Sequence, residues 1–172
     1  MDVTRPTTLS GALDALDSDP AATLLAGGTD LMVEVAYGAR RPASVIALRR
    51  IEELRAWDGR FIGAGVTWAR IERGPIGGLA QAARTVGSPQ IRSAGTIGGN
   101  LGTASPAGDG LPFLAAVDAE VVLESKAGGR RTLPWDRFVT GPKHTARRPD
   151  ELIVGVLLPE ELPPRQEFAK IG

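Results

Sequence analysis

A glycine-rich segment in the middle of the chain constrains the fold more than any other part of the sequence. The run Gly95-Thr96-Ile97-Gly98-Gly99-Asn100-Leu101-Gly102 places four glycines in eight residues, and Ser105-Pro106-Ala107-Gly108-Asp109 follows directly. The pattern predicts a long irregular connection over residues 87–110. Connections of this length are uncommon inside a compact domain and are usually functional where they occur.

This segment has the composition of an anion-binding loop. Its backbone N–H groups are able to form a nest around a pyrophosphate. Asn100 and Ser105 add side-chain hydrogen bonds, and the carboxylate of Asp109 can accept from ribityl or ribose hydroxyls. A glycine-rich structural crossover without a ligand is the alternative.

A second glycine-rich loop, Ala26-Gly27-Gly28-Thr29-Asp30, lies between a predicted strand at 23–25 and a predicted helix at 31–37. Free N–H groups and the helix dipole at such a junction attract anions. For this loop alone, a tight turn with an ordinary cap at Thr29 or Asp30 is the favoured interpretation. Neither loop matches GxxxxGKS/T, and Gly63-Ala64-Gly65 has Trp68 where a Rossmann fingerprint needs its third glycine.

The order of the remaining elements predicts an α+β protein with two lobes. Residues 1–55 are expected to form a small α/β lobe, with helices at 9–16 and 31–37 and strands at 23–25 and 44–48. Residues 56–172 are expected to form a larger lobe with a mostly antiparallel sheet. The predicted strands of this sheet are 54–57, 61–64, 120–124, 130–134, 152–158 and an edge strand at 166–171. The predicted helices of the larger lobe are 67–73, 76–86 and 111–117.

Composition excludes several kinds of chemistry. The chain has no cysteine and a single histidine, His144, which removes disulfides, iron–sulfur ligation and thiolate catalysis from this chain. A redox reaction would therefore need an organic cofactor. Twenty basic residues balance twenty acidic ones, so we expect no nucleic-acid partner. Without an apolar run of about 18 residues or a secretory signal, we expect no membrane span and a soluble, cytoplasmic protein.

A basic cluster, Lys143, His144, Arg147 and Arg148, precedes the predicted strand at 152–158. We interpret His144 as a surface loop residue rather than a proton shuttle.

Several stretches together carry the pattern of a known family. These are LLAGGTDLMV (24–33), FIGAGVTWARIE (61–72), GSPQIRSAGTIGGNLGTASPAGDGLP (87–112), LAAVDAEVVLES (114–125) and the segment 141–159. In this order they resemble the FAD-binding (medium) subunit of the molybdenum hydroxylase family, which includes xanthine dehydrogenases and aerobic carbon monoxide dehydrogenases. The resemblance covers nearly the whole chain. Family members usually continue into a C-terminal domain of another hundred or so residues, which these 172 residues do not include.

The resemblance implies a vanillyl-alcohol-oxidase (PCMH)-type fold in which two lobes hold an extended FAD between them. The loops 26–30 and 96–100 would wrap the pyrophosphate, Ser105 and Asp109 would lie near the cofactor, and Ile153 and Lys170 would lie close to the flavin ring. The residues expected to bind FAD are Leu25, Ala26, Gly27, Gly28, Thr29, Asp30, Leu31, Ala94, Thr96, Ile97, Gly98, Gly99, Asn100, Ser105, Asp109, Ile153 and Lys170. Valine at both Gly98 and Gly99 is expected to abolish FAD binding and to leave a folded chain.

The function implied is electron transfer within an oxidoreductase. The expected partners are a molybdenum-cofactor large subunit and a two-iron two-sulfur small subunit, with NAD, oxygen or a quinone-type molecule as the electron acceptor. The flavin would carry the chemistry, so we expect no catalytic side chain and no metal ligand on this chain. A non-catalytic assembly module and a domain that binds ADP without redox activity are the alternatives.

Overall fold

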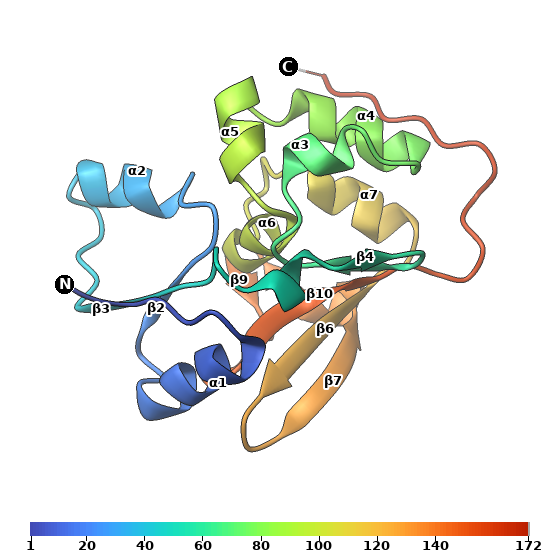
Figure 1. The fold of residues 1–172 in the computed structure, drawn as a ribbon. Coiled ribbons are helices and arrows are strands. Elements are labelled where there is room, and N and C mark those ends of the chain that lie inside the picture. The colour runs from blue at the N-terminus through green and yellow to red at the C-terminus, as the bar shows by residue number, and fades with distance from the viewer. Residues whose placement is uncertain (172) are drawn as a thin grey trace.

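Two larger β-sheets organise the chain, one in each lobe (Figure 1), and a short antiparallel pair of strands, residues 139–141 and 144–145, forms a third sheet. The computed structural model describes residues 1–171. In the N-terminal lobe, strands and helices alternate, and the three strands form a parallel sheet in the order β1-β3-β2. Parallel pairing follows from this alternation, because each helix returns the chain to the end of the sheet from which it started. The elements are β1 (Asp2–Thr4), α1 (Leu9–Ser18), β2 (Thr23–Leu25), α2 (Leu31–Ala36) and β3 (Ser44–Ala47).

The second lobe is built on a five-stranded antiparallel sheet in the order β4-β5-β10-β6-β7. Its strands are β4 (Trp57–Asp58), β5 (Phe61–Gly63), β6 (Glu120–Ser125), β7 (Gly129–Pro134) and the central β10 (Leu152–Leu157). Helices α3 (Trp68–Ile71), α4 (Gly77–Thr85), α5 (Pro89–Ala94), α6 (Ile97–Thr103) and α7 (Gly110–Ala116) lie together on one side of it in Figure 1. The remaining elements are the 3-10 helix η1 (Glu52–Arg55), α8 (Trp135–Phe138), β8 (Val139–Gly141) and β9 (His144–Thr145). This architecture confirms the two-lobed α+β fold, whereas the lobe boundary at residue 55 stays a prediction. Within residues 1–171, no helix combines the length and the apolar character that crossing a membrane requires.

The expected irregular connection at residues 87–110 is wrong, because two short helices form within it. The Oγ of Ser88 accepts a hydrogen bond from the N–H of Ile91 (3.4 Å), which starts α5. The Oγ1 of Thr96 accepts from the N–H of Gly99 (3.0 Å), which starts α6. These side-chain caps start both helices, and tertiary packing of α6 outweighs the low helix propensity of its glycines.

Other elements also differ from the sequence predictions. Residues 166–171 form no strand, because groups on α4 hold this segment instead: Gln81 Oε1 accepts from the N–H of Phe168 (2.8 Å), and the N–H of Gly78 donates to Gln166 Oε1 (3.2 Å). In the first hairpin, residues 52–55 form η1, and only Trp57–Asp58 remain as a strand. The elements β1, α8, β8 and β9 were not predicted, since each has only two to four residues.

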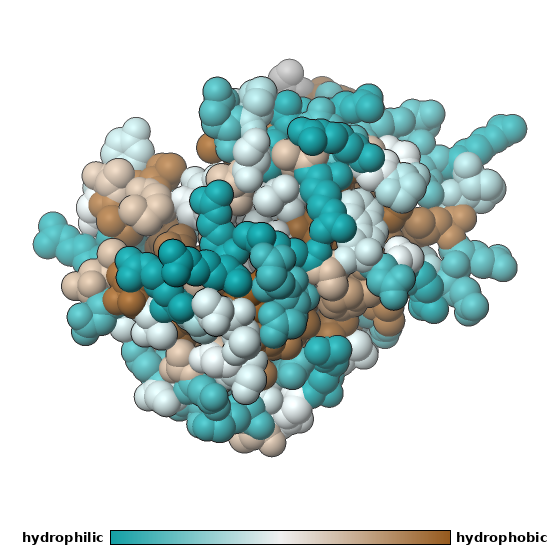
Figure 2. Space-filling model, in the orientation of Figure 1, coloured by the Kyte–Doolittle hydropathy of each residue, from teal (hydrophilic) through white to brown (hydrophobic). Residues whose placement is uncertain are grey.

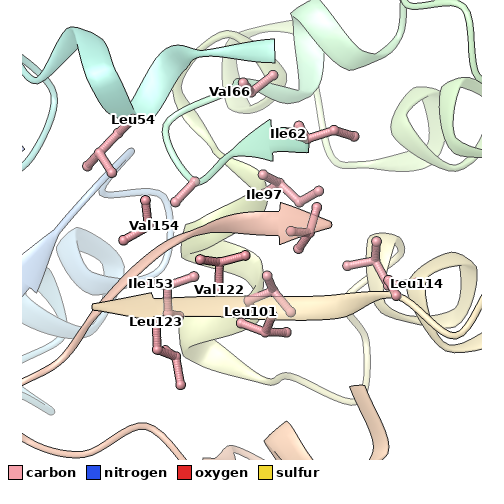
Figure 3. Packing of buried hydrophobic residues seen from close by; sticks show 14 of the residues in the cluster. Leu54, Ile62, Val66, Ile97, Leu101, Leu114, Val122, Leu123, Ile153 and Val154 are labelled. Carbon is pink, nitrogen blue, oxygen red and sulfur yellow. The ribbon is translucent and has the colours of Figure 1, made fainter. Parts of the chain in front are cut away.

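Apolar residues from both lobes form one buried cluster around α6. Ile97 and Leu101, one turn apart on α6, are fully buried. Figure 3 shows them beside the strands β10 and β6, near residues such as Val122. Leu16 of α1 and Ile46 of β3 belong to the same cluster, so the N-terminal lobe shares its core with the second lobe.

The first turn of α6 packs directly on the backbone that follows β5. The N–H of Gly98 donates to the carbonyl of Ala64 (2.9 Å), and the N–H of Ile97 donates to the carbonyl of Val66 (3.0 Å). A Cβ at Gly98 would lie 2.5 Å from the Cβ of Ala64 and 2.7 Å from its carbonyl oxygen. A larger side chain here must displace α6 or Ala64, so valine at this position is expected to destabilise the fold as well as the cleft. The expectation that the double valine variant stays folded remains a prediction.

A buried carboxylate fixes the loop that precedes β10. Glu151 accepts hydrogen bonds from Nε and Nη2 of Arg131 on β7 (2.5 and 2.8 Å) and from the N–H of Arg148 (2.7 Å). Burial alone would raise the pKa of Glu151, but these hydrogen bonds and the positive charges of Arg131 and Arg148 outweigh burial and hold its pKa below the ordinary value. The carboxylate is therefore ionised at neutral pH and organises the loop from Arg147 to Asp150.

Alanine at Gly98 is expected to lower the free energy of unfolding by roughly 1–3 kcal/mol, the usual range for an overpacked site. The added methyl group must push α6 away from Ala64. The matched control is Gly77→Ala in α4, where a Cβ meets no atom within 4 Å. This control should be neutral or more stable by up to about 1 kcal/mol, because alanine has the higher helix propensity. Urea unfolding of both variants is the measurement, and equal stability of Gly98→Ala and the unsubstituted chain would contradict the packing argument.

Glu151→Gln is expected to lower the free energy of unfolding at neutral pH by about 2–4 kcal/mol, because it leaves Arg131 without its counter-charge. The pKa of Glu151 is lower in the folded chain, so the stability it provides is complete above the ordinary value of 4.5 and is lost as the pH falls through the folded pKa. Unfolding measured between neutral pH and acid should show that loss in the unsubstituted chain, and it should be smaller in the variant.

The matched control for Glu151→Gln is Glu124→Gln on β6. Glu124 pairs with Arg130 at 2.7 Å, and the side chains of the arginine and the glutamate are 55% and 20% exposed. A pair with this access to solvent is expected to contribute about 1 kcal/mol or less. Equal destabilisation by the two substitutions would refute a special role for the buried pair.

Candidate cofactor-binding cleft

A cleft of about 1290 Å³ runs between the N-terminal lobe and the helices α5 and α6. Sites for drug-sized ligands have roughly 300–1000 Å³, so this cleft has room for a long ligand such as a dinucleotide. The structure brings every predicted site residue except one to its walls. The exception, Ile97, is fully buried in the core beneath α6.

The loop between β2 and α2 presents a row of unused backbone donors to the cleft. Among residues 1–171, no acceptor is found for the N–H groups of residues 27–31. Gly28 adopts φ +76°, a left-handed conformation that glycine adopts without strain. A Cβ at Gly27 would lie 2.0 Å from the carbonyl oxygen of Ala94, so Gly27 allows the loop to press against the end of α5. Consecutive free amides at the start of a helix are an anion-binding arrangement.

The predicted amide nest of the second glycine-rich segment is not available in residues 97–100. Ile97 and Gly98 donate to carbonyls after β5, as described above. The N–H of Gly99 donates to Thr96 Oγ1 (3.0 Å), and the N–H of Asn100 donates to the carbonyl of Thr96 (3.1 Å). The segment therefore forms a wall of the cleft, while free amides come from the other loop.

Asn100 carries a buried acceptor without a partner. Its Oδ1 is shielded from solvent and accepts no hydrogen bond among the described residues. A Cβ at Gly108 would lie 2.9 Å from Asn100 Nδ2, so glycine at 108 makes room for this amide. An unsatisfied buried polar group costs about 1–3 kcal/mol, and a polyhydroxylated ligand in the cleft would supply the missing donor. The ribityl and ribose hydroxyls of FAD fit this requirement.

Asp109 and Lys170 form an ion pair across the cleft wall. Lys170 Nζ lies 2.8 Å from Asp109 Oδ1, and the Asp109 side chain is only 11% exposed. The chain reaches this point by running from β10 past α4, as Figure 1 shows. Asp109 was expected to accept from sugar hydroxyls, and its carboxylate keeps acceptor capacity beyond the lysine.

The cleft carries a positive charge that the neutral chain as a whole does not. Its walls include the cations Arg40, Arg49, Arg55, Arg70, Lys143, Arg147 and Lys170 and the anions Asp30, Glu34 and Asp109. Burial lowers the pKa of Arg147, but an arginine with Nη1 donating to three backbone carbonyls (2.7–3.3 Å) remains a cation. A positive cleft favours an anionic ligand.

Thr103, Lys143 and Arg147 are among the cleft residues that sequence reasoning did not assign to the site. Thr103 Oγ1 lies within hydrogen-bond distance of Asp30 Oδ2 (3.0 Å) and of the carbonyl of Gly99 (2.9 Å), and brings α6 next to the loop of the first lobe. Lys143 and Arg147 reach the cleft from the β8–β9 hairpin and the loop after it. The basic cluster was visible in the sequence, but nothing in the sequence indicated that two of its members line the cleft.

Apolar side chains are also exposed near one end of the cleft. None of the residues of α2 is buried, and Met32 and Val33 are about half exposed. Figure 2 shows apolar surface on the side of the molecule that carries α2 and hydrophilic residues across the middle of the same face.

Comparisons with known proteins agree with this geometry. Residues 1–161 match the family described as the FAD binding domain in molybdopterin dehydrogenase. The nicotinate dehydrogenase FAD-subunit of Eubacterium barkeri is 39% identical over 167 residues, which are 89% of this chain and 56% of that protein. The carbon monoxide dehydrogenase medium chain of Hydrogenophaga pseudoflava is 34% identical over 161 residues, 86% of this chain and 53% of that one.

Solved structures show the same fold. Carbon monoxide dehydrogenase from Hydrogenophaga pseudoflava, in a form that lacks the Mo-pyranopterin moiety, superposes with a TM-score of 0.87 at 32% identity over 92% of this chain and 58% of that chain. Quinoline 2-oxidoreductase from Pseudomonas putida 86 gives a TM-score of 0.86 at 26% identity over 92% and 59%. The chain thus spans a little more than half the length of these relatives. From residue 1 to residue 161, it belongs to the family of FAD-binding domains of molybdopterin dehydrogenases.

Proposed function

We propose that this chain binds FAD in the cleft between its lobes and serves as the electron-transfer flavoprotein of a molybdenum hydroxylase complex. The family supplies the identity of the cofactor. The row of free amides at residues 27–31 is the observation that carries the assignment to this cleft, because a pyrophosphate is the part of FAD that needs such donors. The proposed binding unit comprises a lobe of residues 1–55 and a lobe of residues 56–172.

The proposed roles of the chain's own residues are to bind and orient. The amides of residues 27–31 and the Thr29 hydroxyl bind the phosphates, and α6 forms the wall against which the cofactor lies. Asn100 accepts from a sugar-like hydroxyl, and the Asp109–Lys170 pair holds the cleft wall beside it. When bound, FAD supplies the one- and two-electron chemistry, while the protein supplies position and electrostatics.

The partners follow from the same proposal. The relatives are designated FAD-subunit and medium chain, which marks them as parts of larger complexes. With no cysteine of its own, this chain would receive electrons from a two-iron two-sulfur subunit, after a molybdenum-cofactor subunit has oxidised the substrate. It would pass them to NAD, oxygen or a quinone-type acceptor.

The first experiment is an FAD titration of the purified chain, followed by visible absorption and flavin fluorescence. We expect a shifted flavin spectrum and saturable binding, with FAD recovered intact from the complex and identified by mass spectrometry. Binding of ADP without any binding of FAD would contradict the proposal and favour the nucleotide-binding alternative. Binding of neither ligand by a folded chain would favour the assembly-module alternative.

Asn100→Leu separates the stability of the chain from cofactor binding. Leucine has a similar size and removes the unsatisfied buried Oδ1, so the variant without FAD should melt at the same temperature or higher. Loss of the hydrogen bond to the cofactor should weaken FAD binding roughly 5- to 10-fold, the effect of about 1–1.4 kcal/mol. Thermal melting and the FAD titration are the two measurements.

The control for Asn100→Leu is Leu101→Met, which changes the next residue of α6 on its core side. This substitution should cost less than about 1.5 kcal/mol of stability and leave FAD affinity unchanged. Unaltered FAD affinity in Asn100→Leu would refute the role given to Asn100.

A further inference from the structure

Lys143 is a cation of the cleft that no carboxylate of residues 1–171 neutralises. Three cations of the cleft walls are paired: Arg40 with Glu34 (3.6 Å), Arg55 with Glu52 (3.0 Å) and Lys170 with Asp109 (2.8 Å). No ion pair is found within the described chain for Arg49, Arg70, Lys143 or Arg147, but the guanidinium groups of Arg70 and Arg147 donate to backbone carbonyls. Lys143 differs from Arg49 in how its backbone is held.

The backbone of Lys143 adopts a conformation that is unfavourable for lysine. Its φ is +59°, in the left-handed region, where residues other than glycine and asparagine are uncommon. Its N–H donates to the carbonyl of Ala104 (2.9 Å). Ala104, at the end of α6, also has a left-handed backbone, with φ +43°. Pro142 and Lys143 form the two-residue turn between β8 and β9, and a positive φ is the conformation required at the second central position of a type II turn. The turn and the hydrogen bond to Ala104 together fix the backbone of Lys143 at the cleft wall.

This contact places Lys143 at the end of α6 that carries the candidate ligand-binding groups. The N–H of Ala104 donates to the carbonyl of Asn100 (3.0 Å). Asn100, whose Oδ1 has no hydrogen-bond partner among the described residues, therefore lies one helical turn before Ala104. The hydroxyl of Thr103, the residue before Ala104, lies within hydrogen-bond distance of Asp30, near the end of the loop with the free amides (residues 27–31). Lys143 therefore adds a cation to the cleft wall near the end of α6 that contacts the free-amide loop.

The carboxylates of this end of the cleft are already engaged. Asp30 accepts from Thr103, and Asp109 pairs with Lys170. Lys143 forms no ion pair with either carboxylate, so its ammonium group is open to an anionic ligand in the cleft. We propose that the ammonium group of Lys143 is a further FAD-binding group that contacts an anionic part of the cofactor, either the pyrophosphate or the edge of the flavin ring that gains negative charge on reduction. This inference rests on the proposed function.

The test compares FAD affinity in Lys143→Met, in Lys143→Arg and in a control. Lys143→Met should weaken FAD binding about 10-fold, because a charge-assisted hydrogen bond is lost. Lys143→Arg should restore most of the affinity. The control is Lys126→Met, whose ammonium group pairs with Asp14 and Asp17 outside the cleft walls (3.0 and 3.4 Å) and should not affect FAD.

The affinity for ADP and the midpoint potential of the bound flavin show which part of the cofactor Lys143 contacts. If Lys143 contacts the pyrophosphate, Lys143→Met weakens the binding of ADP and of FAD to a similar degree. If it contacts the flavin ring, ADP affinity is unchanged and the midpoint potential of the bound flavin falls, because a cation beside the ring stabilises the reduced form. Unchanged FAD affinity together with an unchanged midpoint potential would overturn the inference.

Lys143→Gly separates binding from a purely structural role. Glycine relieves the left-handed strain, so the chain without FAD should melt at a higher temperature. FAD affinity should nevertheless fall as in Lys143→Met. A variant that melts higher and binds FAD as well as the unsubstituted chain would overturn the inference. Failure of the unsubstituted chain to bind FAD would instead refute the proposed function on which the inference rests.

Discussion

The close contact between the first turn of α6 and the backbone after β5 determines most of what the cleft can be. Because Gly98 lies against Ala64 without a side chain between them, α6 runs along the sheet with Ile97 and Leu101 in the core. The opposite side of the same helix then becomes the cleft wall and presents Asn100. Gly27 makes an equally close contact with Ala94, just before α6 begins, so the loop of the first lobe reaches this wall.

The two glycine-rich loops thus have different physical tasks, although they look alike in the sequence. In the α6 segment, the amides are satisfied by protein acceptors and the glycines permit close packing. In the loop between β2 and α2, one glycine permits packing, another provides a left-handed turn, and the amides remain free. Only the second arrangement leaves donors for an anion, and sequence reasoning alone favoured an ordinary turn there.

The sequence predicts more of the fold than of the detailed geometry of the site. Alternation of strands and helices predicted the α/β character of the first lobe, and turn signals such as Asp58-Gly59 predicted hairpins of the second. Helices α5 and α6 could not be predicted from propensity, because their stability comes from the caps at Ser88 and Thr96 and from packing against distant residues. The residues gathered around the cleft were anticipated through family resemblance. The roles of Lys143 and of the Asp109–Lys170 pair depend on contacts between segments far apart in the chain, which local pattern does not encode.

The charges of the cleft suit a protein that holds a redox cofactor better than one that performs acid–base catalysis. A general base needs a carboxylate or an imidazole free to accept a proton. Two carboxylates of the cleft walls are paired with cations, Glu34 with Arg40 and Asp109 with Lys170, and Asp30 lies beside the hydroxyl of Thr103. The one histidine of the chain, His144, is not among the residues of the walls. What the cleft offers instead is unused donors and excess positive charge, which bind an anion and stabilise negative charge that arrives on it. Under the proposed function, the protein therefore supplies recognition and electrostatic tuning, and bound FAD carries the electron transfer.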